Sequence, residues 1–179
     1  MTEFQENVFL GAIIAILGSG AGVFFQHRSW KHQENVRKQD RELAAAQAVF
    51  EETSKNLDER LYRCRQIIFA FRKGDQKKID QKFDEYREVL YRWNDNINRT
   101  YANIEIYFGS PSRQLLEFEI MKEVIYLWML LEREYNNHPN KKSLNDVWDD
   151  INDINGMVYD FDRRLLNMIK LRNIGSFRI

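Results

Sequence analysis

The feature that most constrains this chain is an uncharged segment close to its N-terminus. Residues 8–25, VFLGAIIAILGSGAGVFF, contain no charged residue and no proline. At a helical rise of about 1.5 Å per residue this segment would extend ~27 Å, close to the ~30 Å hydrocarbon core of a bilayer. A buried helix this apolar would need protein on every side, which the rest of the chain does not offer. We therefore expect residues 8–26 to form a transmembrane helix, preceded by an extracytoplasmic tail at residues 1–7.

The charges on either side of the segment predict its orientation. The seven preceding residues contain Glu3 and Glu6 but no Lys or Arg, which argues against a cleaved signal peptide. Between His27 and Arg41 five basic residues outnumber two acidic ones. Because positively charged flanks stay in the cytoplasm, we expect a single-pass protein with its N-terminus outside and everything after the segment in the cytoplasm. The lone Cys64 is compatible with that reducing compartment.

Small side chains recur at spacings of three and four within the segment. They are Gly11, Ala15, Gly18, Ser19 and Gly22. Small residues at this spacing let helix backbones approach closely in lipid, although glycine is also generally frequent in membrane helices. Because the row continues over three turns, we expect these residues to pack against other copies of the chain. The sequence thus predicts a homo-oligomer within the lipid bilayer.

The rest of the chain has the apolar spacing of helices. Apolar residues recur at steps of four and three over residues 50–71, 79–107 and 144–168, and no segment shows a sustained period of two. Breaks are expected at Gly74-Asp75, at Gly109 and at His138-Pro139, with Ser110 as the N-cap before Pro111. Ser143 and Asp146 resemble a capping box.

These features predict an all-α fold. Short connections make neighbouring helices antiparallel, so we expect a cytoplasmic four-helix bundle over residues 44–174. A basic helical stalk at residues 27–43 would continue from the transmembrane helix, and residues 175–179 would form a basic tail. The run VIYLWMLL at residues 124–131 is too short to cross a bilayer, so its helix, which we expect over residues 112–137, should be the most enclosed one. Cys64 lies at an apolar step and is expected to be a small buried residue.

The sequence contains no motif that assigns chemistry. No histidine follows a Glu at the spacing of a di-metal site, and no phosphate-binding or nucleophile motif is present. The acidic group Asp146, Asp149, Asp150 and Asp153 is explained by the dipole of the helix that it opens. Lys and Arg total 27, as do Asp and Glu, which argues against a generic nucleic-acid binder. We therefore assign no catalytic residue, no cofactor and no metal ligand.

The C-terminal part of the chain is basic. After Asp162 it carries Arg163, Arg164, Lys170, Arg172 and Arg178 and no acidic residue. In the expected topology these residues lie at the membrane end of the bundle, where they would contact anionic lipid headgroups. A phosphate-rich small ligand is a second possibility. A third is that the charges only complement the dipole of the last helix.

The segments GVFFQHRSWKH, WNDNINR and YFG resemble a diffuse group of uncharacterised bacterial proteins. Those are single-pass membrane proteins with helical cytoplasmic domains, often encoded in mobile elements and beside phage-defence genes. The resemblance covers the layout and about thirty residues, and it implies a bacterial inner (plasma) membrane location. It transfers no catalytic motif.

Three functions therefore compete. The first is a non-enzymatic membrane-anchored oligomer that scaffolds or signals through its bundle, with a cytoplasmic protein partner or an anionic small ligand. The second is a phage-defence effector whose bundle senses a ligand or partner and whose assembled spans disturb the membrane. The third is an enzyme, which the missing motifs disfavour.

Overall fold

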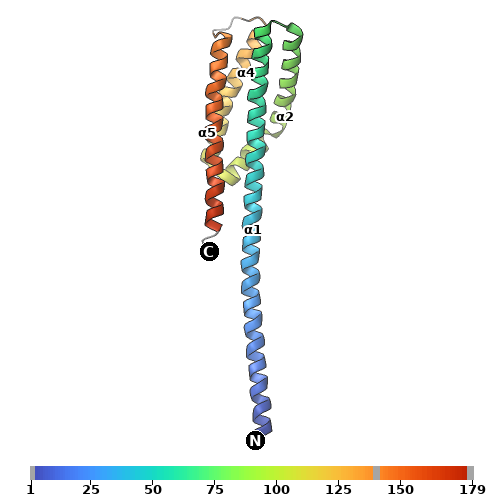
Figure 1. Ribbon diagram of the computed structural model, residues 1–179, viewed down its shortest axis with the longest axis vertical. Coiled ribbons are helices and arrows are strands. Elements are labelled where there is room, and N and C mark those ends of the chain that lie inside the picture. Colours follow the sequence, from blue (N-terminus) through green and yellow to red (C-terminus); the bar gives the residue numbers. More distant parts are fainter. Residues whose placement is uncertain (1–2, 139–141, 177–179) are drawn as a thin grey trace. The chain divides into compact units, whose positions relative to one another are not determined.

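The computed structural model describes the backbone of residues 3–138 and 142–176 and the side chains of residues 26–138 and 142–172. All of its described elements are helical (Figure 1). In chain order they are α1 (Glu3–Lys73), α2 (Gln76–Phe108), α3 (Ser110–Gln114), the π-helical turn η1 (Leu115–Ile120), α4 (Met121–Tyr135) and α5 (Leu144–Ser176). The predicted all-α class is confirmed for this described part of the chain.

The chain divides into two compact units, Met1–Glu42 and Leu43–Ile179, and α1 contributes to both. In the first unit every described side chain, from residue 26 to residue 42, is exposed, as the polar sequence there would require. The predicted transmembrane residues 8–25, with their row of small residues, lie outside the described side chains. Among the side chains that are described, no helix has the length and apolar character to cross a bilayer.

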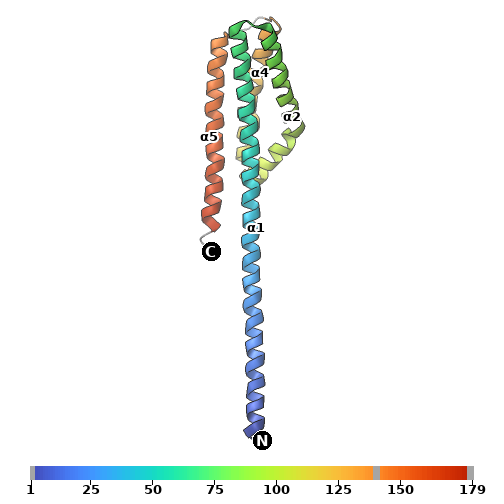
Figure 2. The same cartoon turned by 45° about the vertical axis from the view of Figure 1, so that its right-hand side comes forward.

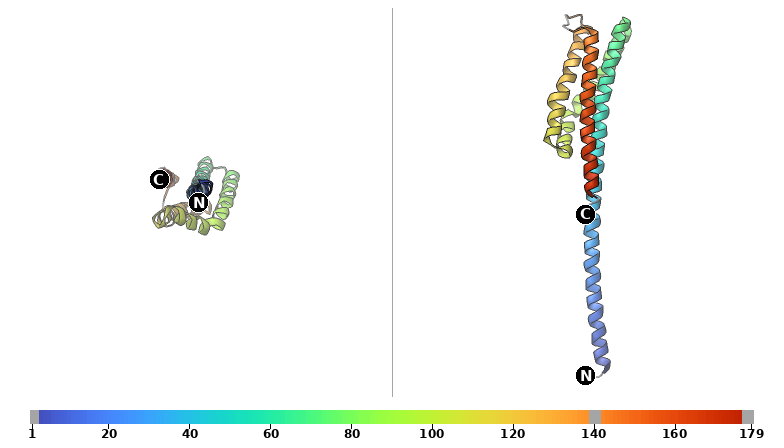
Figure 3. Two further views of the ribbon diagram at one scale, coloured as in Figure 1. Left: turned by 90° about the horizontal axis from the view of Figure 1, so that it is seen from below. Right: turned by 60° about the vertical axis from the view of Figure 1, so that its left-hand side comes forward.

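The second unit is a bundle of antiparallel neighbours (Figures 2 and 3). On α1 and α5, Ser54 donates a hydrogen bond of 2.7 Å to Asp162, while Arg72 donates one of 2.9 Å to Asn145. The α5 residues that contact α1 therefore have lower numbers as the α1 residue number rises, so the two helices are antiparallel. The same order joins α1 to α2 through two ion pairs of 3.0 Å, Glu59–Arg92 and Glu52–Arg99.

The helix ends follow the local sequence. Gly74 has φ +66°, a conformation open to glycine, and Asp75 accepts a hydrogen bond of 3.2 Å from the Lys78 amide as the N-cap of α2. The Ser143–Asp146 capping box is confirmed, because each residue's backbone amide donates to the other's side chain, at 2.8 and 3.3 Å.

The prediction that Ser110 caps the following helix is wrong. Gly109, at φ +83°, occupies the N-cap position, and Ser110 is the first residue of α3. The chain reverses at the residue that tolerates a positive φ, which places the break one position earlier than the Ser-Pro pair indicates.

The core lies inside the second unit and follows most of the predicted apolar positions. Fully buried side chains from each long helix meet there, among them Leu57, Leu61, Cys64, Ile68, Phe83, Tyr86, Ile104, Leu127, Ile151, Phe161 and Leu165. The helix that begins near residue 110 is continuous but passes through the π-helical turn η1, which the spacing did not indicate.

We expected the helix that contains residues 124–131 to be the most enclosed one, and the structure shows that it is buried on one side and open on the other. Val124, Leu127 and Leu131 are buried, but Ile125 and Met129 are about half exposed, at 49% and 52%. The bundle covers only one side of α4. An apolar run on such a helix therefore fills the core with one set of residues and leaves the others uncovered.

Candidate functional site

The outer side of η1 and α4 carries apolar side chains that the bundle does not cover. Phe118, Ile125, Tyr126 and Met129 are each at least 43% exposed, and Lys122 lies among them. We refer to these five residues as the α4 face. Four of them, at positions 118, 122, 125 and 129, follow steps of four, three and four. This spacing places their side chains along one line of the helix, as in a helix–helix contact.

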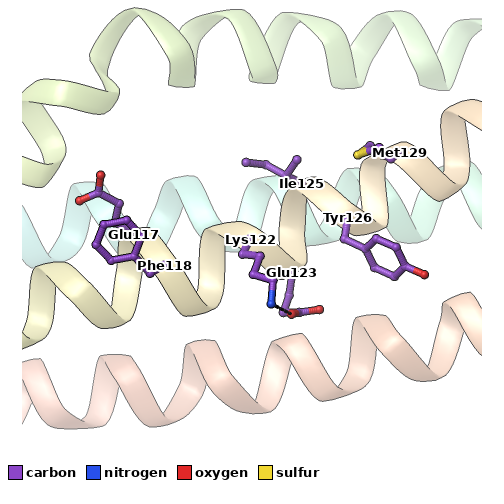
Figure 4. A pocket seen from close by; sticks show the side chains of 7 residues that line it. All are labelled: Glu117, Phe118, Lys122, Glu123, Ile125, Tyr126 and Met129. Carbon is purple, nitrogen blue, oxygen red and sulfur yellow. Dashed lines mark ion pairs between the residues drawn. The ribbon is translucent and has the colours of Figure 1, made fainter.

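Phe118, the first residue of this line, lies in the π-helical turn. The Met121 amide donates to the Leu116 carbonyl, five residues earlier, so that this turn holds one residue more than an α-helical turn. Leu116 and Ile120 remain fully buried while Phe118, between them, is 63% exposed. Figure 4 shows Phe118 and Met129 near the two ends of the group, with Lys122, Ile125 and Tyr126 between them.

Two hollows lie along this surface. The larger, about 650 Å³, is lined by the α4 face together with Glu117 and Glu123. The smaller, about 150 Å³, lies between α4 and α5, where Asp153 and Met157 contribute from α5. Glu123 and Tyr126 line both, and we refer to the two hollows together as the α4–α5 groove.

The groove is acidic as well as apolar. Four carboxylates line it, those of Glu117, Glu123, Asp150 and Asp153, against the single ammonium group of Lys122. Arg113 lies 3.0 Å from Glu117, and Lys142 lies 2.7 Å from Asp150.

The other two carboxylates are less well paired. Glu123 meets Lys122 only at 3.8 Å, and Asp153 makes no ion pair within the described residues. Four carboxylates against the three cations Lys122, Arg113 and Lys142 leave this surface with one negative charge in excess. The pKa of Lys142 is raised, chiefly by its hydrogen bond to Asp150, which keeps that pair charged.

The composition of this groove suits the binding of a partner. An exposed apolar strip bordered by charge is typical of protein contact surfaces. Within residues 26–138 and 142–172, no group of three His, Cys, Asp or Glu side chains is placed to hold a metal ion. Asp146 and Asp150, from the acidic group at the start of α5, are instead bound to Ser143 and Lys142.

The structure does not gather the sequence-predicted site residues into this groove. Arg163, Arg164, Lys170 and Arg172 are all exposed on α5, and Arg163 pairs with Asp160 at 3.0 Å. Neither hollow contains any of them. Arg178 and the small residues of the predicted membrane segment, Gly11, Ala15, Gly18, Ser19 and Gly22, lie outside the described side chains. The basic residues keep their proposed lipid or phosphate role as a prediction.

Sequence reasoning also missed a buried cation. Arg60 is 1% exposed; its guanidinium donates to the Tyr86 hydroxyl at 3.2 Å and lies 5.4 Å from the centre of the Trp93 ring. The Arg60 Nε and the Trp93 Nε1 have no hydrogen-bond partner within the described part of the chain. Burial raises the pKa of the neighbouring Cys64 thiol to about 12, so that thiol stays protonated and unreactive at neutral pH. Neither hollow opens onto this cluster, and we assign it to stability.

The signal for the α4 face was present in the sequence. Two apolar rows run along residues 116–131, one at 116, 120, 124, 127 and 131 and the other at 118, 125 and 129. A helix with two apolar rows has more apolar surface than one side of a bundle can cover.

Comparisons with known proteins identify no relative. A scan against protein-family models found no match, and neither a search of curated proteins nor a search of solved structures returned a similar chain. The functional conclusions therefore depend on the residues and geometry described above.

Proposed function

We propose that this protein is a non-enzymatic, membrane-anchored scaffold or signalling component that acts through contacts made by its helical bundle. The observation that carries the proposal is the α4 face, where four large apolar side chains are at least 43% exposed on the outer side of η1 and α4. An uncovered apolar strip of this kind gains free energy when a partner removes it from water.

Membrane anchoring is the second part of the proposal, and it is supported by the sequence. Residues 8–25 are uncharged and long enough to cross a bilayer, and the basic flank that follows orients the bundle toward the cytoplasm. An anchor would confine the bundle to a surface and raise its effective concentration for other membrane-bound molecules. A reporter fused after Ile179 should be active only as a cytoplasmic reporter, and activity of a periplasmic reporter there would contradict this orientation.

Oligomerisation is the third part, and it is supported by the row of small residues in the same segment. The double substitution Gly18→Ile and Gly22→Ile would place branched side chains where helix backbones approach, while lipid would still solvate them. Insertion should survive and crosslinked oligomers in native membranes should decrease, whereas the control Ile16→Leu should crosslink like the wild type. Equal crosslinking of the double variant would show that the row is incidental.

A second candidate is an effector that disturbs the membrane through its assembled spans. The same row of small residues favours it, because close helix packing is what a multi-span assembly requires. Expression should then be toxic to the host cell, and the Gly18→Ile, Gly22→Ile variant should relieve that toxicity. A non-toxic wild type would leave the scaffold as the better proposal.

A further inference from the structure

We propose that the α4–α5 groove binds a cationic amphipathic helix of a protein partner. This inference rests on the proposed function, because it specifies what the scaffold's exposed surface recognises. It follows from the shape, charge and composition of the groove.

The shape of the surface fits a helix. Positions 118, 122, 125 and 129 present side chains at the alternating steps that interlock with a neighbouring helix. From 118 to 129 they extend over about three helical turns, ~16 Å, which is long enough to contact an amphipathic helix whose anchors at i, i+3, i+4 and i+7 span ~10 Å. The adjoining space between α4 and α5, which reaches Met157, would receive one edge of that helix.

The charge of the groove specifies a basic partner. Glu123 and Asp153 lie on opposite helices of the groove, and neither is held by a close ion pair within the described residues. Lysine or arginine side chains beside the apolar row of an incoming helix would meet both carboxylates. Partner and groove would then complement each other in both apolar contact and charge.

The same charges disfavour two other occupants. A second copy would present an identical groove, so that Glu123 and Asp153, which no close ion pair within the described residues holds, would face a lining of the same net negative charge. An anionic lipid surface would be repelled by Glu123 and Asp153.

The composition of the groove also suits helix binding. Met129 on α4 and Met157 on α5 are unbranched and polarisable, so they adapt to apolar side chains of different shape. Tyr126, which lines both hollows, offers a large ring at low cost in side-chain entropy. Methionine-lined grooves are a recurring solution for binding amphipathic helices.

The test is a binding titration on the full chain in phosphatidylcholine nanodiscs. The probe is a fluorescent 17-residue helix of leucine and lysine, LKKLLKLLKKLLKLLKK, followed by anisotropy. The comparison peptides have the same leucines with glutamate in place of lysine, or the same composition in an order without helical period. Empty discs measure binding to lipid alone, which the zwitterionic headgroups keep low.

Two groups of variants locate the binding. Ile125→Asp on the α4 face and the surface variant Glu123→Lys with Asp153→Lys should each weaken binding about tenfold or more, which corresponds to the loss of one strong interface residue. The matched control is Ile106→Asp, because Ile106 is an equally apolar residue, 69% exposed, on α2. The control should bind like the wild type, and circular dichroism checks that each variant is folded. If Ile125→Asp fails to fold, the charge variant alone decides.

The expected result is binding of the leucine–lysine helix that both groups of variants weaken and that neither comparison peptide reproduces. No binding, equal binding of the leucine–glutamate helix, equal binding to empty discs, or unchanged binding by the variants would overturn the proposal. Disulfide crosslinking of Met129→Cys between two copies, without peptide binding, would assign the groove to a second copy instead.

The same experiment separates this inference from the proposed function. A chain that does not co-purify with the discs contradicts the anchor, and the titration is then made on the protein in buffer. Peptide binding in buffer would support the groove even though the anchor had failed.

Discussion

The buried guanidinium of Arg60 should be coupled energetically to a single hydroxyl. Its shortest hydrogen bond goes to Tyr86 Oη at 3.2 Å, with the Met121 sulfur at 3.7 Å as a weak second acceptor. Tyr86→Phe deletes that acceptor and keeps the ring, which stacks on Trp128 with centroids 4.3 Å apart. The substitution therefore isolates the hydroxyl from the packing around it.

The magnitude follows from what the cation loses. A hydrogen bond to a charged group contributes ~1.5–3 kcal/mol, and a buried charge that loses its partner keeps its desolvation cost. Tyr86→Phe should thus lower the free energy of unfolding by about 2 kcal/mol in the wild type. In the Arg60→Met background no guanidinium donates to the hydroxyl, so Tyr86→Phe should lower the free energy of unfolding by less than ~0.5 kcal/mol. The predicted coupling is about 1.5 kcal/mol or more.

The effect of Arg60→Met on stability should be small, although the residue is fully buried. Methionine has no charge to desolvate, and this gain offsets the loss of the hydrogen bond and of the cation–π contacts with Trp93 and Tyr86, which contribute ~1–2 kcal/mol. We expect the stability to stay within ~2 kcal/mol of the wild type. Arg60→Ala should be worse because it leaves a cavity.

The assay is urea unfolding of the four chains of the cycle, followed by circular dichroism, with thermal melts as a second measurement. For a chain of this size 1 kcal/mol corresponds to ~2–4 °C, so Tyr86→Phe should lower Tm by about 4–8 °C in the wild type and by ~2 °C or less in the Arg60→Met background. Equal effects in the two backgrounds would refute the reasoning, because the hydroxyl would then act independently of the cation.

Three further predictions concern the core. Trp128→Ala should lower the free energy of unfolding by ~3–5 kcal/mol, since it removes a ring packed on Tyr86 and Phe83, whereas Tyr126→Ala should change the melt little. Burial raises the pKa of the Cys64 thiol from 9.0 to about 12, so the stability that the protonated thiol contributes is complete below pH 9 and is lost as the pH rises toward 12. Alkylation of Cys64 at pH 8 should be slow in the folded protein and fast in the protein unfolded by urea. Burial also raises the pKa of Asp162 above its ordinary value of 3.8, so Asp162→Asn should raise Tm at pH 7, and this advantage should be lost as the pH falls through the raised pKa to below 3.8.

The bundle could be predicted from the sequence because its helices and their ends are marked by residues close together in the chain. Steps of four and three between apolar residues define helices whatever those helices pack against. Gly74 and the Ser143–Asp146 pair mark helix ends through contacts between residues no more than three positions apart. The prediction of Ser110 as a cap missed by one residue because two neighbours suit the position and only the backbone dihedral of Gly109 decides between them.

The exposed face and the buried cation could not be predicted in the same way. Whether Ile125 and Met129 are covered depends on how many helices surround α4, which is a property of the whole bundle. Arg60 carries a charge, and a lone arginine beside apolar positions is ordinarily assigned to the surface. Its burial depends on Tyr86 and Trp93, which lie 26 and 33 residues further along the chain.

The most direct test of the account is alkaline carbonate extraction of membranes from cells that express the full chain. We expect the wild type to stay in the membrane pellet because residues 8–25 would be integral to the bilayer. The double substitution Ile13→Arg and Ile14→Arg places two charges near the middle of that segment and should release the chain to the supernatant. A wild-type chain that leaves the membrane with the carbonate wash would contradict the anchor, and the proposed membrane scaffold with it.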